Sequence, residues 1–345
     1  MGPFIKDKND SNKNQIYLLI ALIPIILFAL IKKGQDLSII NLILLPSITF
    51  ILEGIFNLIT EKNIKYIIKD NFGILKGLII ALLLPNNTPL VAIVTGIVSA
   101  IIITKILFLI FKKEILNGTV LSLLIIYILV KIISPNTEII DQTIANQNIT
   151  NIGTYETLIK PYGRLINILI GNIEGMLCSM SSIIGMLIFA YLILVKAIKW
   201  KIPTTYILTV FAMTYVIGGT NDLGIWYSTF QVITCGLIFK AIFLAADNET
   251  SPVTSIGQIF YGIGLGIITV LFRYLTPIPE GILISVLIMN ILTPILDRIG
   301  AIARFDFKKT IIPFLITWIL IIGLSVGISI KYKNPEPIGQ PNIEN

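Results

Sequence analysis

Charged side chains inside long apolar stretches are the residues of this sequence whose type and position could support chemistry. A charge at the centre of a bilayer costs roughly 2.5–3.5 kcal/mol on insertion scales, so each one needs a partner or a water-filled cavity. Lys131, Lys240 and Arg273, near the ends of their stretches, are expected to reach along the hydrocarbon to the membrane surface. Glu53 and Lys105 lie deeper, and a functional cavity and a structural pairing both stay open for them. The whole set is Glu53, Lys76, Lys105, Lys131, Glu174, Lys240 and Arg273.

Two residue types that carry much enzyme chemistry are rare or missing. The chain has no histidine, which excludes His-ligated haem, His-based metal sites and Ser-His or Cys-His catalytic pairs within it. Cys178 and Cys235 each lie within an apolar stretch, so neither a disulfide framework nor an iron–sulfur site is indicated, and small apolar side chains are the favoured interpretation. We predict no catalytic residue and no metal site.

The elements that position these charges must be membrane helices. Hydrophobic residues make up 55% of the chain, charged residues 13%, and the mean hydropathy is +0.90, which lies outside the range of soluble domains. The net charge of +7 sits mostly in short segments between apolar runs, as the positive-inside rule describes. No basic stripe with interleaved aromatic residues is present, so nucleic acid is not an expected partner.

Long apolar runs predict about ten or eleven transmembrane helices, because about 20 residues are needed to cross the hydrocarbon core. The first run follows a basic tail and is interpreted as a signal anchor, since no small-residue cleavage site follows it. The chain is therefore expected to be an all-α, multi-pass membrane protein. The runs are 16–31, 37–59, 73–85, 89–111, 116–134, 175–196, 203–219, 224–246, 256–274, 278–296 and 311–330.

Lysine and arginine positions predict the orientation and the organisation of the chain. Counting spans from a cytoplasmic N-terminus puts the clusters at 62–69, 196–201 and 298–309 inside, although Lys32 and Lys33 then fall outside. The predicted parts are 1–134, a tail and a first five-helix repeat; 135–172, an extracytoplasmic loop; 173–300, a second five-helix repeat; and 301–345, a basic linker, an extra helix and a tail.

Two polar breaks suggest that the five-helix halves are related. Pro85-Asn-Asn-Thr-Pro89 separates the third and fourth spans, and Asp247-Asn-Glu-Thr-Ser-Pro252 separates the eighth and ninth. The breaks are five spans apart, and an odd number of spans per repeat gives the two repeats opposite orientations, as in transporters with inverted repeats and broken helices. Two ordinary polar turns remain an alternative interpretation.

The glycines of Tyr261-Gly-Ile-Gly-Leu-Gly266 resemble a phosphate-binding loop only superficially. No strand precedes them and no basic residue follows closely, as such a loop would require. Small residues in membrane helices favour close helix packing instead.

Several motifs resemble the RnfD subunit of the Rnf electron-transport complex, whose family also includes the NqrB subunit of the sodium-translocating NADH:quinone reductase. The resemblance covers about residues 15–300. It implies an inverted repeat of five plus five helices, related to urea-transporter-like channels, and leaves the run at 311–330 as an added eleventh helix. The motifs are 69–85 (KDNFGILKGLIIALLLP), 200–203 (WKIP), 243–254 (FLAADNETSPVT), 257–264 (GQIFYGIG), 279–281 (PEG) and 290–297 (NILTPILD).

The resemblance also implies a flavin. Members of the family carry FMN joined by a phosphoester to a threonine in an outward loop, with a lysine six residues later. Thr154 and Lys160 match these two positions, although Asn151-Ile-Gly precedes the threonine where the family has Ser-Gly-Ala. Ser181 keeps the last residue of a Gly-Glu-Thr-Ser motif, and Asp247 and Thr250 keep the ends of an Asp-Pro-Val-Thr motif. These five residues are the expected cofactor-binding set.

The leading hypothesis is therefore a membrane subunit of an Rnf-like complex in the bacterial inner (cytoplasmic) membrane. It would couple flavin-mediated electron transfer to movement of Na+ or H+, with other membrane and redox subunits as partners. Glu53 and Asp70, which match the family's pattern, are the candidates for an ion path. A flavin-free transporter or channel on the same scaffold, and a purely structural subunit, are the alternatives.

Overall fold

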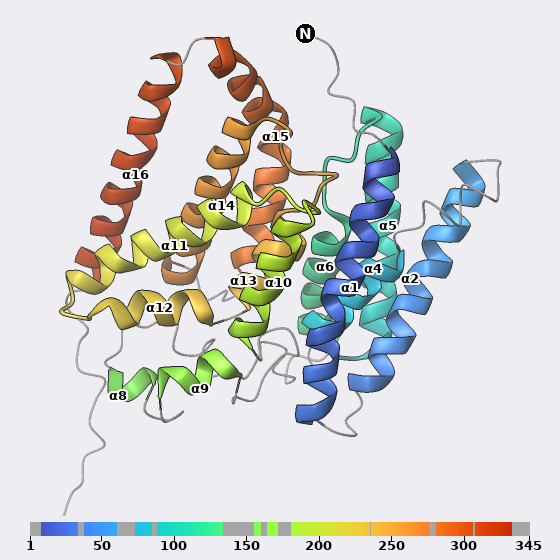
Figure 1. Ribbon diagram of the computed structural model, residues 1–345. Helices are drawn as coiled ribbons and strands as arrows, with labels where there is room; N and C mark the ends of the chain where they lie inside the picture. Colours follow the sequence, from blue (N-terminus) through green and yellow to red (C-terminus); the bar gives the residue numbers. More distant parts are fainter. Residues whose placement is uncertain are drawn as a thin grey trace, which may run out of the picture.

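A computed structural model describes residues 8–33, 38–60, 73–84, 88–133, 155–159, 164–171, 181–234, 236–275, 281–305 and 308–332. Within these ranges the regular elements are all helical (Figure 1). They are α1 (Lys8–Lys33), α2 (Ser38–Thr60), α4 (Gly73–Leu83), α5 (Leu90–Phe111), α6 (Gly118–Ile133), α8 (Tyr155–Leu158), α9 (Leu165–Ile170), α10 (Ser182–Leu194), α11 (Lys201–Gly219), α12 (Ile225–Ile233), α13 (Leu237–Lys240), the π-helical turn η3 (Ala241–Ala245), α14 (Ser255–Leu275), α15 (Gly281–Phe305) and α16 (Lys308–Tyr332).

The helices confirm an all-α integral membrane protein. Five of them, among the described residues, are long and apolar enough to cross a bilayer: α5, α11, α14 and parts of α1 and α15. A sixth crossing is possible if α12 and α13 with η3 count as one span, bent by 57°. Shorter apolar helices occur in α2, α4, α6, α10 and α16, so each predicted apolar run corresponds to one helix or to this bent pair.

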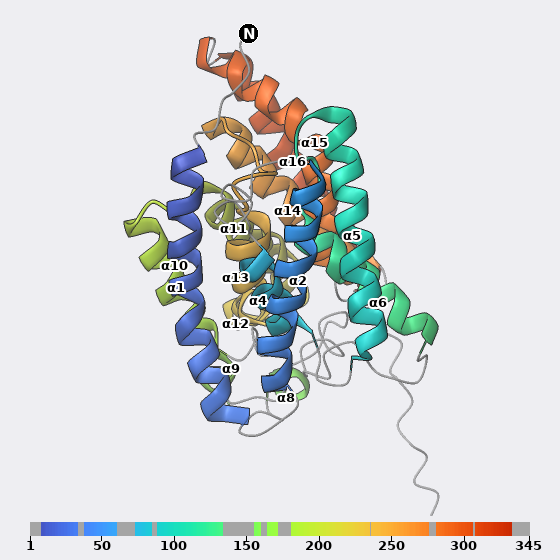
Figure 2. The same cartoon turned by 90° about the vertical axis from the view of Figure 1, so that its right-hand side faces the viewer.

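Equivalent helices of the two predicted repeats are in contact. The first helices of the repeats, α1 and α10, pack against each other, and so do the last helices, α6 and α15. In Figure 1, α1 descends from the end where the N-terminus lies, whereas α10 rises from the side of α9. A view turned by 90° (Figure 2) keeps α1 and α10 side by side. The arrangement is the one expected of an inverted repeat.

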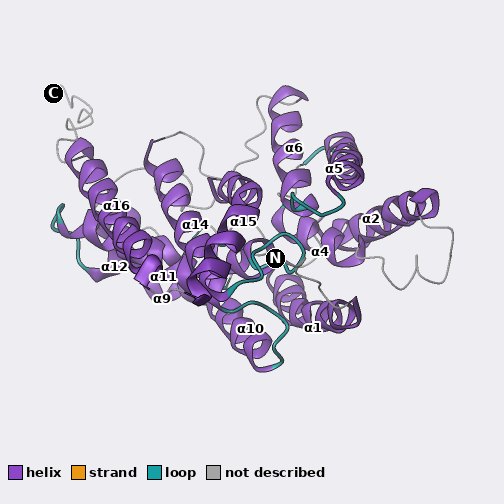
Figure 3. Cartoon of the chain, turned by 90° about the horizontal axis from the view of Figure 1, so that it is seen from above, coloured by secondary structure: helices purple, strands orange, loops and turns teal. Residues whose placement is uncertain are grey.

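Within each half, equivalent helices pair. In the first half α2 packs on α4 and α5 on α6; in the second α11 packs on α12 and α14, and α14 on α15. Seen from above (Figure 3), the two groups form two lobes, with α1 and α10 between them. The additional helix α16 lies mainly against α11, on the outer side of the second lobe.

Close helix contacts depend on glycine. A Cβ on Gly77 of α4 would lie 2.5 Å from Cα of Pro46 and 2.8 Å from the carbonyl O of Leu45 on α2. On α14, a Cβ on Gly262 would lie 2.8 Å from the carbonyl O of Ile202, and one on Gly266 would lie 2.6 Å from Cβ of Thr209. Small residues let membrane helices approach closely, so the predicted role of the 261–266 run in packing is confirmed.

The break between α12 and α13 is a local change of backbone direction. Gly236 has φ of 59°, a left-handed conformation that favours glycine, and it begins α13. The chain then continues into η3, whose π-helical turn ends at Ala245. π-Helical turns are rare and are frequently found at functional sites. This break directs the chain toward the loop that begins at Asp247.

Candidate functional site

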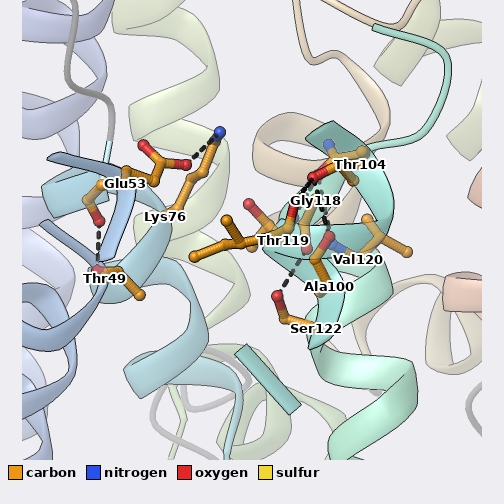
Figure 4. A network of polar contacts seen from close by, with 12 residues as sticks. Thr49, Glu53, Lys76, Ala100, Thr104, Gly118, Thr119, Val120 and Ser122 are labelled. Carbon is orange, nitrogen blue, oxygen red and sulfur yellow. Dashed lines mark hydrogen bonds and ion pairs between the residues drawn. The ribbon is translucent and has the colours of Figure 1, made fainter. Parts of the chain in front are cut away.

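An ion pair lies inside the first half. Nζ of Lys76 on α4 is 2.7 Å from Oε1 of Glu53 on α2, and Figure 4 shows the two side chains reaching toward each other. Glu53 is 7% exposed. One turn of α2 earlier, Thr49 donates to the carbonyl O of Gly73 at 2.6 Å and so ties α2 to the start of α4. The pair gives Glu53 the partner that a buried charge requires.

Lys76 also faces a polar cavity between the two halves. The cavity is bounded by α1, α4 and the start of α6 from the first half, and by η3 and the following loop from the second. Its volume is about 60 Å³, and one water needs about 10–15 Å³ by a comparable measure. The space therefore suits a few waters or a small cation. The polar wall consists of Asn14, Gln15, Lys76, Glu114, Asn117, Thr119, Asp247, Asn248 and Glu249.

The loop after η3 is held by its own side chains. Oδ2 of Asp247 accepts from the hydroxyl of Thr250 at 3.0 Å, and Oδ1 accepts from the backbone N–H of Glu249 at 3.4 Å. From the segment after α10, Lys199 Nζ donates to Ser251 Oγ at 2.7 Å and to the carbonyl O of Asn248 at 3.3 Å. The structure therefore brings Asp247 and Thr250 together, as members of one loop at the cavity.

Carboxylates crowd this part of the cavity. Burial against the cavity wall, together with the neighbouring carboxyl of Glu114 and then Asp247, raises the pKa of Glu249 well above its ordinary value, while Lys76 acts in the opposite direction. Glu249 lies in the loop between η3 and α14 and is half-buried. A proton on this carboxyl reduces the repulsion among the three acids. The cavity wall therefore combines three acidic side chains with the ammonium of Lys76.

Asn117 links the two halves at the cavity. Its Nδ2 donates to the carbonyl O of Leu244, in η3, at 3.2 Å, while its Oδ1 accepts from the backbone N–H of Thr119 at 3.0 Å and of Val120 at 3.3 Å. The same side chain therefore caps the start of α6 and supports the π-helical turn of the other half. It is 5% exposed. Sequence reasoning did not select Asn117, because its partner is 127 residues away.

Asp297 on α15 is a second residue that sequence reasoning did not place in a site. Its Oδ1 accepts from the backbone N–H of Val253 at 2.8 Å and of Thr254 at 3.0 Å, at the start of α14. A carboxylate at this position satisfies N–H groups that a helix N-terminus leaves unpaired. It thereby fixes the end of the Asp247 loop. The only sequence signal was its place at the end of the 290–297 motif.

The other predicted cofactor residues do not join Asp247 and Thr250. Ser181 caps α10, accepting from the backbone N–H of Ile184 at 3.3 Å. Asn248 contacts the carbonyl O of Ala197, beyond the opposite end of α10. Thirteen residues of helix separate these ends, which is about 20 Å. Thr154 and Lys160, and the ion-path candidate Asp70, lie outside the described residues.

An aromatic cluster lies next to Thr154 in the sequence. Tyr155 opens α8, and its ring contacts that of Trp226 on α12 edge to face, at 5.2 Å between centroids. Trp226 contacts Tyr227 in the same way at 5.8 Å, and the hydroxyl of Tyr227 is 2.6 Å from that of Tyr274 on α14. Tyr155 is 41% exposed. The cluster offers a partly exposed aromatic surface beside the predicted flavin attachment residue.

Two predictions about charged side chains are wrong. Arg273 is fully buried and Lys240 is 2% exposed, so neither reaches the membrane surface as expected. Arg273 turns inward because α12, the half-helix after α11, folds back beneath the end of α14 and covers it. Sequence position near a span end cannot reveal such a covering element. Lys131, in contrast, is exposed in the last turn of α6, as predicted.

Comparisons with known proteins agree with the resemblance found in the sequence. The NQR2, RnfD, RnfE family matches residues 1–306. The chain is 35% identical over 140 residues to the RnfD subunit of a proton-translocating ferredoxin:NAD+ oxidoreductase complex of Clostridium ljungdahlii, covering 41% of this chain and 42% of the relative. It is 36% identical over 124 residues to the corresponding subunit of the Na+-translocating complex of Acetobacterium woodii, covering 36% of each.

A longer alignment is found with a more distant relative. The NqrB subunit of the Na+-translocating NADH-quinone reductase of Stutzerimonas stutzeri is 26% identical over 264 residues, which cover 73% of this chain and 65% of the relative. The aligned segments span less than half of the two RnfD subunits and about two thirds of this NqrB subunit. The family match, in contrast, extends from the N-terminus to the end of α15 and leaves out only α16 and the tail. The chain therefore belongs to the NQR2, RnfD, RnfE family.

Proposed function

We propose that this chain is a membrane subunit of an Rnf-like electron-transport complex, which couples flavin-mediated electron transfer to the movement of Na+ or H+ across the membrane. The observation that carries the proposal is the family match over residues 1–306. Relatives are named as subunits of ion-translocating oxidoreductase complexes. The chain works with other membrane and redox subunits, because it has no dinucleotide-binding fingerprint or cysteine cluster to accept electrons from a soluble donor.

The cavity between the halves supports the ion-translocating part of this proposal. Inverted-repeat membrane proteins place coupling-ion sites at the interface of the repeats, near broken helices. Here Lys76, Glu114, Asp247 and Glu249 line such an interface, and the Glu53–Lys76 pair extends it into α2. A cation entering the cavity would compete with Lys76 for the carboxylates. Glu53 therefore remains a candidate for the ion path, together with Asp70.

Attachment of FMN at Thr154 is the flavin part of the proposal. The aromatic surface of Tyr155 and Trp226 fits an isoalloxazine ring, which stacks on aromatic side chains, and the Lys160 ammonium would offset phosphate charge. When bound, the flavin supplies the electron transfer itself. Ser181 accepts a hydrogen bond from the backbone N–H of Ile184, and Thr250 donates one to Asp247; these three residues stay in the proposed cofactor-binding set with Thr154 and Lys160.

Covalent flavin is tested directly on the purified chain. Fluorescence of the band on a denaturing gel, with mass spectrometry of the peptide that contains Thr154, should show one FMN per chain when the protein is made in its native host. Thr154→Val should abolish both signals, whereas Thr150→Val, a change in the same loop, should leave them unchanged. An unmodified Thr154 in the wild-type protein would remove the flavin from the proposal.

A flavin-free transporter or channel is the second candidate. It is favoured by the polar cavity between the halves, whose walls carry Lys76, Glu114, Asp247 and Glu249. Ion flux into vesicles that contain this chain alone would support it. Two other observations would support the redox complex instead. Genes for the remaining complex subunits would lie next to the gene for this chain, and the chain would be found in the bacterial inner membrane.

A further inference from the structure

The second half contains a permanently charged side chain whose hydrogen-bond acceptors are neutral. Arg273, in the last turn of α14, is fully buried. Its Nη1 donates to the carbonyl O of Gln231 at 2.9 Å and to Oε1 of Gln231 at 3.3 Å. Its Nε and Nη2 are buried without a hydrogen-bond partner, and no carboxylate of the described residues contacts them.

The hydrogen bonds around Arg273 are also incomplete. Its Nε and Nη2, the Nε2 of Gln231 and the Oγ of Ser228 are buried without a hydrogen-bond partner in the described part of the chain. Gln231 and Ser228 are both fully buried and lie three residues apart, on one face of α12. A buried donor without an acceptor destabilises the folded state. Such a cluster in a native protein calls for an acceptor that the described residues do not provide.

The chemistry of the cluster selects a small anion. Arginine cannot lose its proton in a protein, so burial cannot neutralise it as it can a lysine or a glutamate. Nε–H and Nη2–H project from the same edge of the guanidinium group, the edge that holds an anion through two parallel hydrogen bonds. Gln231 Nε2 and Ser228 Oγ add further donors beside it.

We propose that Arg273, Gln231 and Ser228 form an internal site for a small monovalent anion such as chloride or nitrate. The site lies between α12 and α14 near the aromatic cluster, because Tyr274 follows Arg273 and its hydroxyl meets that of Tyr227. It is separate from the cavity between the halves and does not depend on the proposed redox function.

The test is the thermal unfolding of the full chain in lipid nanodiscs, titrated with chloride or nitrate against gluconate at constant ionic strength. Binding to the folded state alone raises the unfolding midpoint with ligand concentration. The wild-type midpoint should rise and saturate in chloride and in nitrate, and gluconate should have no effect. Arg273→Gln should lose this dependence, and Lys131→Gln, which changes an exposed cation, should keep it. Equal wild-type midpoints in all three salts would overturn the proposal, because they would show that neither chloride nor nitrate binds the folded chain.

Two further variants decide the question if Arg273→Gln fails to fold. Gln231→Glu places a carboxylate where Oε1 already lies 3.3 Å from Nη1 of Arg273, so it should raise the midpoint in gluconate and abolish the response to chloride. Ser228→Ala should keep the response but require a severalfold higher chloride concentration for half of the effect. A wild-type response to chloride in Gln231→Glu would contradict the assignment.

Discussion

Lys76 of α4 and Glu53 of α2 form an ion pair of 2.7 Å at the wall of the cavity between the two halves. The pairing explains how two charges are accommodated within apolar helices. Lys76 also lines the cavity, so the pair connects α2 with the cavity wall. The pair is therefore a structural contact next to the proposed ion path.

Removing one partner of this pair should be more harmful than removing both. Lys76→Met leaves Glu53 without its counter-charge and should destabilise the protein by roughly 2–3 kcal/mol, within the range for uncompensated membrane charges. The double variant Glu53→Gln with Lys76→Met should recover most of that loss, since replacing a whole buried pair is often nearly neutral. Thermal unfolding in detergent measures both. A double variant that is as unstable as the sum of the single variants would show that the two residues are not coupled.

Glycine contacts should matter only where another helix is close. Gly262→Ala places a methyl group against Thr205 and Ile202 of α11 and should destabilise the protein by about 1–3 kcal/mol. Gly323→Ala on α16, where nothing lies within 4 Å of a new Cβ, is the matched control and should be neutral or slightly stabilising. Comparison of the two unfolding midpoints checks the close packing of α11 on α14. Equal effects at both positions would contradict it.

Two substitutions separate the roles of Asn117. Asn117→Asp keeps an oxygen that caps α6 but loses the donor to Leu244, whereas Asn117→Ala loses both interactions. The cap is worth about 1 kcal/mol, so Asn117→Ala should be less stable than Asn117→Asp. If the link to η3 supports ion movement, both variants should reduce ion transport of the assembled complex to a similar degree. Wild-type transport in Asn117→Asp would assign Asn117 a capping role alone.

The raised pKa of Glu249 predicts a dependence of stability on pH. With the pKa raised in the folded state, the folded protein binds more protons than the unfolded chain at pH values above the ordinary 4.5. The free energy of unfolding should therefore decrease as the pH rises from about 4.5 toward the folded-state pKa. Glu249→Gln should flatten this decrease, while Asp222→Asn, at an exposed position, should not. Unfolding midpoints measured across this pH range provide the test, and an unchanged slope in Glu249→Gln would refute the prediction.

Sequence alone was sufficient for properties that depend on composition and local spacing. The apolar runs determined the membrane location and the helices, since the bilayer permits few other spanning structures. The glycines of the 261–266 run predicted close packing, which α11 and α14 show. The five-span separation of the two polar breaks predicted repeats of opposite orientation, and α1 and α10, the first helices of the two predicted repeats, run in opposite directions. Motif residues were sufficient to identify the family.

Tertiary structure alone decided which charges meet and which are covered. Glu53 pairs with Lys76, 23 residues away, and Asn117 donates a hydrogen bond to Leu244, 127 residues away. No local sequence pattern specifies such contacts. Arg273 was expected at the membrane surface because it stands near the end of an apolar run, yet α12 folds back over it. Burial of a side chain is a property of the packed helices around it, so the same residue in the same run can be exposed or enclosed. The cavity and the candidate anion site exist only through that packing.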